Sequence, residues 1–281
     1  MATPFVPKQA LNFHGALLQE LQGNVSDTIA QSLLRELPTL TSTSVVHDNG
    51  CSYGAVTLAI LALDPPPVGA QVYATDVNPM FQAQLKAELA KISSPPVKVE
   101  VDTMDACNLS FPDAAFDLSI TSFVFAGLAD DVAAAKHILR TLKPGGTGVI
   151  GVWKSMPWHV ALENAHIKTR GTDEPMAPFL SKSWYGKERI EQVTTEAGWE
   201  DVQYIDKAAW LNLGTDLERW ARIAWTFLAT PVGGWTQRDE DRWDEAISSI
   251  SHELAQSDMH KFEDGIHKIR MVADIAVVRK K

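Results

Sequence analysis

Short apolar runs alternate with segments of helical period between residues 45 and 153, and this alternation limits the fold more than any other feature of the sequence. Strands that alternate with helices form a parallel sheet with right-handed crossovers. In such a sheet, ligands bind at the carboxyl ends of the strands. The predicted strands cover residues 45–48, 71–75, 97–101, 116–123 and 147–153, and the predicted helices cover residues 55–63, 81–91 and 132–142.

The composition is that of a globular protein and argues against several kinds of partner. Of the 281 residues, 45% are hydrophobic and 21% are charged, which suits a chain that buries a sizeable core. The formal net charge of −10 argues against nucleic acid, because binding to a phosphate backbone depends on clustered Lys and Arg. Cys51 and Cys107 are the only cysteines, so we expect neither a disulfide framework nor a metal site.

The sequence shows no targeting or membrane signal. No apolar stretch approaches the roughly 18 residues that a membrane-spanning helix needs, and the first residues lack the basic and then apolar pattern of a secretory leader. We therefore expect a cytoplasmic protein that does not associate with membranes.

Two further zones flank the alternating one. Apolar residues between Leu17 and Leu37 recur at spacings of three, four and seven, the period of helices that bury one face, and Pro38 ends this run. All nine tryptophans lie from Trp153 onward. We expect an N-terminal helical cap over residues 1–40 and one domain over residues 41–281, with lid helices inserted at about residues 207–260.

The first predicted strand passes into its helix through residues 48–54, Asp-Asn-Gly-Cys-Ser-Tyr-Gly, where glycines permit a tight turn and the close approach of a ligand. The segment is a poor dinucleotide fingerprint, because Ser52 occupies the middle glycine position. It also matches the Gly-x-Ser-x-Gly elbow of serine hydrolases. Only one strand and no oxyanion loop precede it, so we favour a third interpretation, a nucleoside-binding loop.

Acidic residues at the next two strand ends favour a nucleoside. Asp76 ends the second predicted strand, where a carboxylate can accept hydrogen bonds from both ribose hydroxyls. Its alternative role is to cap the helix that begins near Pro79. Asp105 follows the third strand and is placed to accept from an adenine amino group while Met104 packs on the ring, although carboxylates are common in turns.

Together with residues 111–117 and 139–146, these segments resemble, in order, the class I S-adenosylmethionine-dependent methyltransferases. Each motif alone is weak, whereas the ordered set is strong over residues 40–153. The resemblance implies an α/β, Rossmann-like, seven-stranded and mostly parallel sheet with helices on both faces and a helical cap over the active site. It also implies a sixth strand at residues 202–205 and an antiparallel last strand at residues 269–278.

The chain further resembles fungal small-molecule methyltransferases of secondary metabolism, including the branch that methylates dithiols. The segments that carry this resemblance are residues 48–51, 54–56, 152–153 and 157–158, whereas Ser52 departs from the commoner glycine pattern. It implies S-adenosyl-L-methionine as cofactor. The cofactor-binding residues that follow are Asp48, Asn49, Gly50, Cys51, Gly54, Asp76, Val77, Met80, Met104, Asp105, Ala106 and Thr121.

The acceptor is expected to be a thiol, hydroxyl or amine of a small molecule. We lean toward a thiol, because a thiol near its thiolate pKa needs little help from a base. His14 is the candidate base if one is used, although a surface histidine is the plainer interpretation. Candidate substrate residues are Phe13, Phe123, Trp153 and Trp220, for which packing in the core is the alternative. We expect a monomer or a homodimer.

Two other functions remain open from the sequence. A nicotinamide-dependent oxidoreductase also uses an acidic strand end and a glycine turn for its adenosine ribose, but the turn at residues 143–146 and Asp105 favour the methyltransferase. The fold can also keep its nucleoside pocket for binding alone or for a cyclisation, because fold does not fix function.

Overall fold

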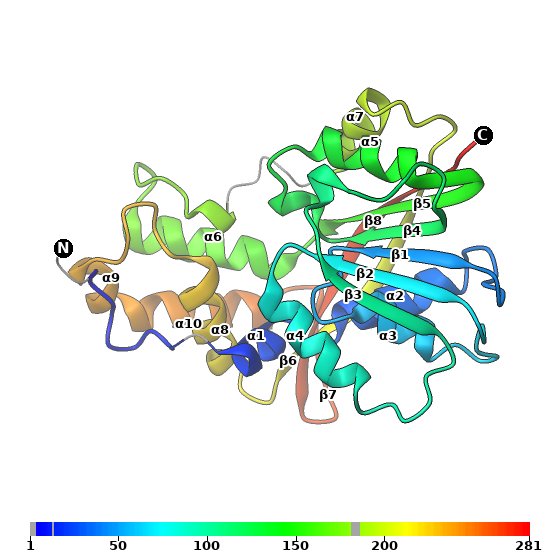
Figure 1. Cartoon of the computed structure of the whole chain (residues 1–281). Helices are drawn as coiled ribbons and strands as arrows, with labels where there is room; N and C mark the ends of the chain where they lie inside the picture. Colours follow the sequence, from blue (N-terminus) through cyan, green and yellow to red (C-terminus); the bar gives the residue numbers. More distant parts are fainter. Residues whose placement is uncertain (1–3, 13, 181–185) are drawn as a thin grey trace. The chain divides into compact units, whose positions relative to one another are not determined.

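The structure is a computed structural model that describes residues 4–12, 14–180 and 186–281, and it comprises two compact units (Figure 1). Unit 1 contains residues 1–25, 155–183 and 208–272, and unit 2 contains residues 26–154, 184–207 and 273–281.

Unit 2 is built on the parallel strands that the alternating pattern predicts. The strands β1 (Val45–Asn49), β2 (Gln71–Asp76), β3 (Lys98–Thr103), β4 (Phe116–Ser122) and β5 (Leu142–Ser155) lie in the order β3-β2-β1-β4-β5, and each neighbouring pair is parallel. The strand order reverses between β1 and β4. Ligands of open α/β sheets bind outside the strand ends at such a point.

The sheet continues from β5 through β8 (Ile266–Arg279) to β6 (Gln203–Gly214). β8 runs antiparallel to β5, since the backbone N–H of Gly145, near the start of β5, donates to the carbonyl of Lys280, which follows β8, over 2.7 Å. The sixth strand and the antiparallel last strand implied by the resemblance are therefore confirmed, and both are longer than expected.

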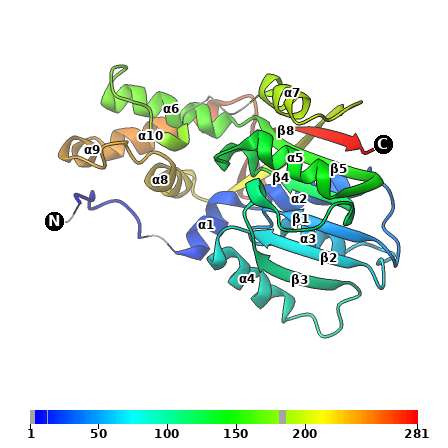
Figure 2. The ribbon, with the colours of Figure 1, turned by 45° about the horizontal axis from the view of Figure 1, so that its top comes forward.

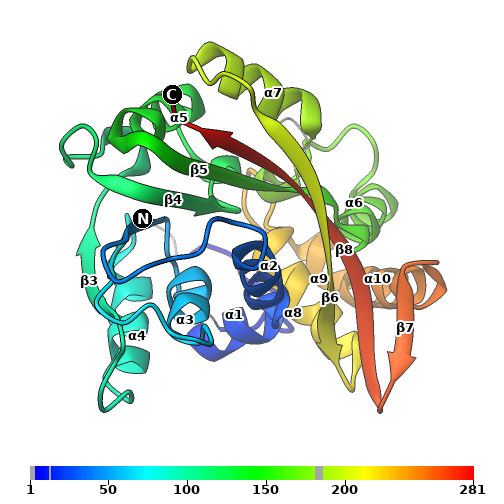
Figure 3. The same ribbon diagram turned by 90° about the vertical axis from the view of Figure 1, so that its right-hand side faces the viewer.

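An eighth strand, β7 (His260–Glu263), pairs antiparallel with β8 and was not expected from the sequence (Figure 3). Asp264 and Gly265 join the two strands, with φ angles of 54° and 76°. An Asp-Gly pair with positive φ is the usual two-residue turn of a hairpin. This dipeptide was the available signal, because four residues are too few to show a period.

Helices cover both faces of the sheet in unit 2 (Figure 3). α5 (Asp131–Thr141) and α7 (Lys187–Glu196) pack on one face, where Ile138 and Val193 join a core with Phe116 of β4. α2 (Val25–Leu34), α3 (Ala55–Leu61) and α4 (Pro79–Leu89) lie on the other face. The expected Rossmann-like fold with helices on both faces is thus confirmed.

Unit 1 is mainly helical and holds most of the tryptophans. Its helices are α1 (Gly15–Gln22), α6 (Pro157–Arg170), α8 (Leu217–Leu228), α9 (Gln237–Asp241) and α10 (Trp243–Gln256), and α6 lies beside α10 (Figure 2). Trp220, Trp225 and Trp243 are almost fully buried. The buried Arg170 pairs with Asp239 at 2.7 Å and lies over the ring of Trp225.

The N-terminal amphipathic run forms two helices, because Gly23 ends α1 with a φ of 52°. The division between the units falls just after it, at Val25. The short 3-10 segments are η1 (Ala106–Asn108), η2 (Phe125–Gly127) and η3 (Pro178–Leu180). In the part of the chain that the structure describes, no helix has the length and apolar character to cross a membrane.

Candidate functional site

The loop after β1 is fastened to the end of β2 by backbone hydrogen bonds. The N–H groups of Gly50 and Cys51 both donate to the carbonyl of Thr75, over 2.7 and 2.8 Å. The N–H of Ser52 donates to Oδ2 of Asp76 over 2.9 Å. Thr75 and Asp76 therefore set the shape of the loop, and only Asp76 was predicted from the sequence.

Both glycines that flank the loop are required by conformation and by packing. Gly50 and Gly54 have φ angles of 74° and 94°, in the region that favours glycine. A Cβ on Gly50 would lie 2.3 Å from Cγ2 of Val124, and a Cβ on Gly54 would lie 2.4 Å from Cδ1 of Leu85. The loop therefore packs tightly between the start of η2 and α4.

Ser52 behaves as a member of this loop. Its φ of 47° is left-handed, which costs a residue other than glycine roughly 1–2 kcal/mol. Its backbone N–H is held by Asp76. The glycine that is commoner at this position would avoid this strain.

Asp48 is buried at the end of β1 and connects this strand to the first turn of α3. Its Oδ2 accepts from the backbone N–H of Thr57 over 3.0 Å and from the Thr57 hydroxyl over 2.6 Å. Burial raises the pKa of the Asp48 carboxyl to about 6, and the charge of Asp76 adds to the rise although both Thr57 bonds oppose it. A direct contact of Asp48 with the cofactor stays a prediction.

This raised pKa predicts how stability changes with pH. The unfolded carboxyl has a pKa near 3.8 and the folded one near 6, so between these values the folded chain holds a proton that the unfolded chain has released. The contribution of Asp48 to the free energy of unfolding is greatest below pH 4 and falls by roughly 3 kcal/mol as the pH rises through 6.

Urea unfolding of the wild type and of Asp48→Asn between pH 4 and pH 8 tests this expectation. The stability of the variant relative to the wild type should increase as the pH rises, because the variant has no carboxyl to ionise. If the difference in free energy of unfolding between the variant and the wild type stayed constant over this range, the raised pKa of Asp48 would be contradicted.

Asp76 ends β2 with each carboxylate oxygen accepting one backbone N–H. Oδ2 accepts from Ser52, and Oδ1 accepts from Asn78 over 2.8 Å. A carboxylate offers about four acceptor positions, so both oxygens can accept again from a ligand. The alternative role predicted for Asp76, capping α4, belongs to Asn78, whose Oδ1 accepts from the N–H of Met80 over 3.0 Å.

Apolar side chains and the end of β3 adjoin Asp76. Val77 and Met80 are 68% and 45% exposed, which makes them available to a ligand. The N–H of Met104 donates to the carbonyl of Asp76 over 3.1 Å, which holds the two strand ends together. Asp105 is exposed, and its Oδ1 accepts from the N–H of Cys107 over 2.8 Å to cap η1. Its contact with adenine stays a prediction, as does that of the buried Ala106.

Asn49 and Thr121 lie at the point where the strand order reverses. Nδ2 of Asn49 donates to Oγ1 of Thr121 over 3.1 Å, and both side chains are buried. Oδ1 of Asn49 is buried and has no hydrogen-bond partner among the residues that the structure describes. The structure thus brings together two residues that the sequence assigned to the site, and one of them carries a buried acceptor that the described residues leave unsatisfied.

His47 is a further polar side chain that sequence reasoning missed. Its ring nitrogens lie 2.9 Å from Oγ1 of Thr75 and 3.4 Å from Oγ of Ser119. Burial lowers the pKa of His47 to about 3, so the ring is neutral at physiological pH. His47 is a positioning residue for Thr75, whose carbonyl holds the loop. The available signal was a histidine that directly follows two valines in a predicted strand.

Phe123 directly follows β4, and Trp153 lies two residues before the end of β5. Their rings stack face to face with centroids 3.8 Å apart and planes at 2°. Phe123 has a φ of 62°, which is rare for a bulky residue. Strained conformations of this kind cluster at functional sites. The contact of these two rings with substrate stays a prediction.

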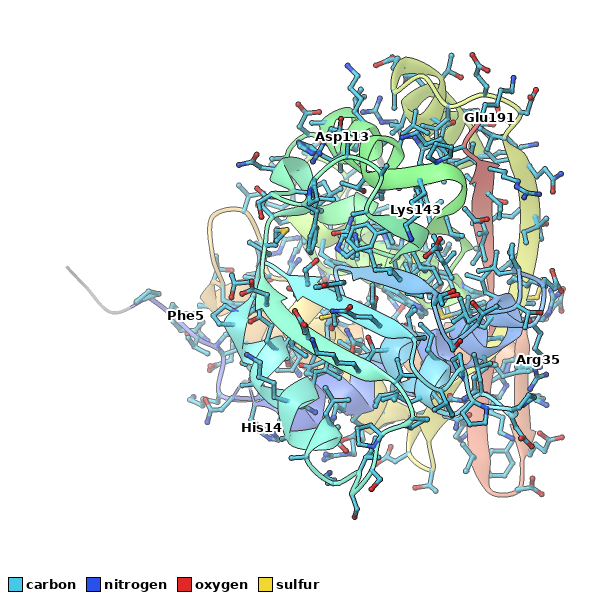
Figure 4. The ribbon with its side chains drawn as sticks, turned by 45° about the vertical axis from the view of Figure 1, so that its right-hand side comes forward. Phe5, His14, Arg35, Asp113, Lys143 and Glu191 are labelled. Atoms are coloured by element: carbon cyan, nitrogen blue, oxygen red, sulfur yellow. The ribbon has the colours of Figure 1, made fainter. Side chains whose placement is uncertain are left out.

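The remaining predicted residues belong to unit 1 or are not described. His14 is exposed where α1 begins (Figure 4). Trp220 is buried beside Trp158, with ring centroids 6.3 Å apart, so packing in the core is the role that the structure shows. Phe13 lies outside the described residues. The substrate roles of Trp220 and Phe13 and the base role of His14 stay predictions.

Known proteins resemble this chain in the region of the site. Residues 47–150 match a family described as a methyltransferase domain. The chain is 23% identical over 188 residues to Methyltransferase tpcH of Aspergillus fumigatus, with 64% of this chain and 65% of that protein covered. It is 30% identical over 113 residues to a demethylmenaquinone methyltransferase of Paenarthrobacter aurescens, with 36% and 45% covered. The matched region thus spans about half to two thirds of these relatives.

A solved structure shows the same fold over nearly the whole chain. The 4+2 cyclase SpnF has a TM-score of 0.51 and 17% identity, and the comparison covers 90% of this chain and 81% of that one. Identity at this level shows the fold alone. The family match at residues 47–150, the strand order of the sheet and the acidic and glycine residues at its edge agree, and together they support a class I S-adenosylmethionine-dependent methyltransferase domain in this part of the chain.

Proposed function

We propose that the chain binds S-adenosyl-L-methionine at the carboxyl ends of β1, β2 and β3 and transfers its methyl group to a small molecule. The observation that carries this proposal is the Gly50 loop held against Asp76, with acceptor positions left on both carboxylate oxygens. Asp76 would accept from the ribose hydroxyls, and Val77 and Met80 would pack against the adenosine.

The sulfonium of the cofactor is itself a good leaving group, so the protein has to hold the acceptor in line with the methyl carbon and exclude water. Gly50 and Gly54 let backbone groups approach the methionine portion. Asn49 adds a buried acceptor in the same loop. Phe123 and Trp153 would provide an aromatic wall for the acceptor molecule.

The acceptor atom is a thiol, hydroxyl or amine in our proposal, and we favour a thiol. A thiol forms a reactive thiolate near neutral pH, whereas an alcohol or a protonated amine needs a base. The role in secondary metabolism that we propose rests on the resemblance of residues 48–51, 54–56, 152–153 and 157–158 to fungal small-molecule methyltransferases. The chain is also similar to a methyltransferase of the fungus Aspergillus fumigatus. The protein would act as a monomer or a homodimer in the cytoplasm, with an N-terminal helical cap at residues 1–40 and lid helices at about residues 207–260.

Incubation with cofactor labelled in its methyl group and a panel of small thiols, phenols and amines tests this function. Label should appear in at least one acceptor, and S-adenosylhomocysteine should inhibit this methyl transfer. Binding of S-adenosylmethionine without transfer to any of these acceptors or to a cell extract would favour the alternative, which is a binding or cyclising role. The 4+2 cyclase SpnF has a similar fold, and fold does not fix function.

A further inference from the structure

The hairpin of β7 and β8 carries two histidines on one face. Phe262 pairs directly with His267, and His260 pairs with Ile269, so these four side chains share a face of the hairpin. Lys261, Lys268 and Glu263 alternate to the opposite face, where Glu263 accepts from both lysines over 2.8 Å. The two imidazoles are therefore diagonal neighbours on the face without these charges.

The two rings lie unusually close together. Nε2 of His260 is 2.9 Å from Nδ1 of His267, and the ring centroids are 5.2 Å apart with planes at 27°. Both side chains are half-buried, and the ring of Phe262 lies 4.6 Å from that of His267. The hydrogen bond between these two nitrogens contains one proton. When no proton lies between them, each nitrogen has a lone pair.

This separation suits joint coordination of one metal ion. At a metal–nitrogen distance of about 2.0–2.1 Å, two ligands at a right angle lie about 2.9 Å apart. We propose that His260 and His267 form a binding site for a divalent first-row transition-metal ion, such as Ni²⁺, Cu²⁺ or Zn²⁺, which takes the place of the shared proton.

The residues around the two histidines determine which metal ions the site would bind. Among the described residues, no group of three or more His, Cys, Asp or Glu lies together, so water would complete the coordination. Imidazole suits these metals, whereas Mg²⁺ and Ca²⁺ prefer oxygen ligands.

Calorimetric titration of the full chain with NiCl₂ at pH 7.5 tests the site. We expect saturable binding of one ion in the wild type, at least about tenfold weaker binding in His267→Gln and in His260→Gln, and no comparable effect of MgCl₂. The matched control is His252→Gln, an exposed histidine of α10, which should bind Ni²⁺ as the wild type does.

A second readout guards against misfolded variants. The imidazole resonances of His260 and His267 should be the ones that Ni²⁺ broadens in the wild type, and far-ultraviolet circular dichroism should show each variant folded. Wild-type protein that binds no Ni²⁺, or folded His260→Gln and His267→Gln variants that bind it as tightly as the wild type, would overturn the proposal.

Discussion

Gly50→Ala is expected to lower the affinity for S-adenosylhomocysteine by a factor of at least about 30. The new Cβ would lie 2.3 Å from Cγ2 of Val124, and the φ of 74° is unfavourable for alanine. Overpacking and left-handed strain together cost roughly 2–5 kcal/mol, and each 1.4 kcal/mol corresponds to a tenfold change. Relief of the clash would move the loop away from Thr75 and break the two backbone bonds that shape it.

Gly127→Ala is the matched control for this substitution. Gly127 lies three residues after Val124, has no left-handed φ, and a Cβ placed on it meets nothing within 4 Å. This variant should bind the ligand as the wild type does. If Gly50→Ala and Gly127→Ala bound S-adenosylhomocysteine with equal affinity in calorimetry, the loop would not be part of the cofactor site.

Asp76→Ala is expected to lower the affinity for S-adenosylhomocysteine by a similarly large factor, for an electrostatic reason. The ionised carboxylate would accept from the two ribose hydroxyls, and hydrogen bonds to charged groups contribute roughly 1.5–3 kcal/mol each. Loss of one such bond weakens binding by roughly 10- to 150-fold, and loss of both weakens it further. Asp102→Ala is the control, because this carboxylate is exposed at the end of the neighbouring strand β3.

A ligand without the 2′-hydroxyl separates the ribose role of Asp76 from its role in the loop. Asp76 also holds the N–H groups of Ser52 and Asn78, so its removal disturbs the loop as well. If the ribose role is correct, the deoxy ligand should lose less affinity on Asp76→Ala than S-adenosylhomocysteine does. Equal losses for the two ligands would show that Asp76 acts only through the loop.

Much of the sheet was predictable because buried parallel strands and amphipathic helices leave regular patterns. The strand predicted at residues 71–75 is β2, and the helix predicted at residues 132–142 is α5 within one residue at each end. The division into units was not predictable, because it depends on contacts between segments far apart in the sequence. Residues 155–183 and residues 208–272 both belong to unit 1, and no local sequence pattern indicates this grouping.

The candidate site was predictable where a residue acts through its position at a strand end. Asp76 and Asn49 are such residues, and the structure places both beside the loop. Thr57, Thr75 and His47 were missed, since each acts through a partner on another element rather than through a motif of its own. The roles of the tryptophans could not be predicted. Neither spacing nor composition distinguishes a ring packed in the core, such as that of Trp220, from one that lines a pocket.

Calorimetry with two nucleotide ligands tests the central claim most directly. S-adenosylhomocysteine and NAD both contain adenosine, but only the first belongs to a methyltransferase site. The wild-type chain should bind S-adenosylhomocysteine with one site per chain, show no comparable binding of NAD, and lose S-adenosylhomocysteine binding in Gly50→Ala. Tight binding of NAD with no binding of S-adenosylhomocysteine would contradict the account.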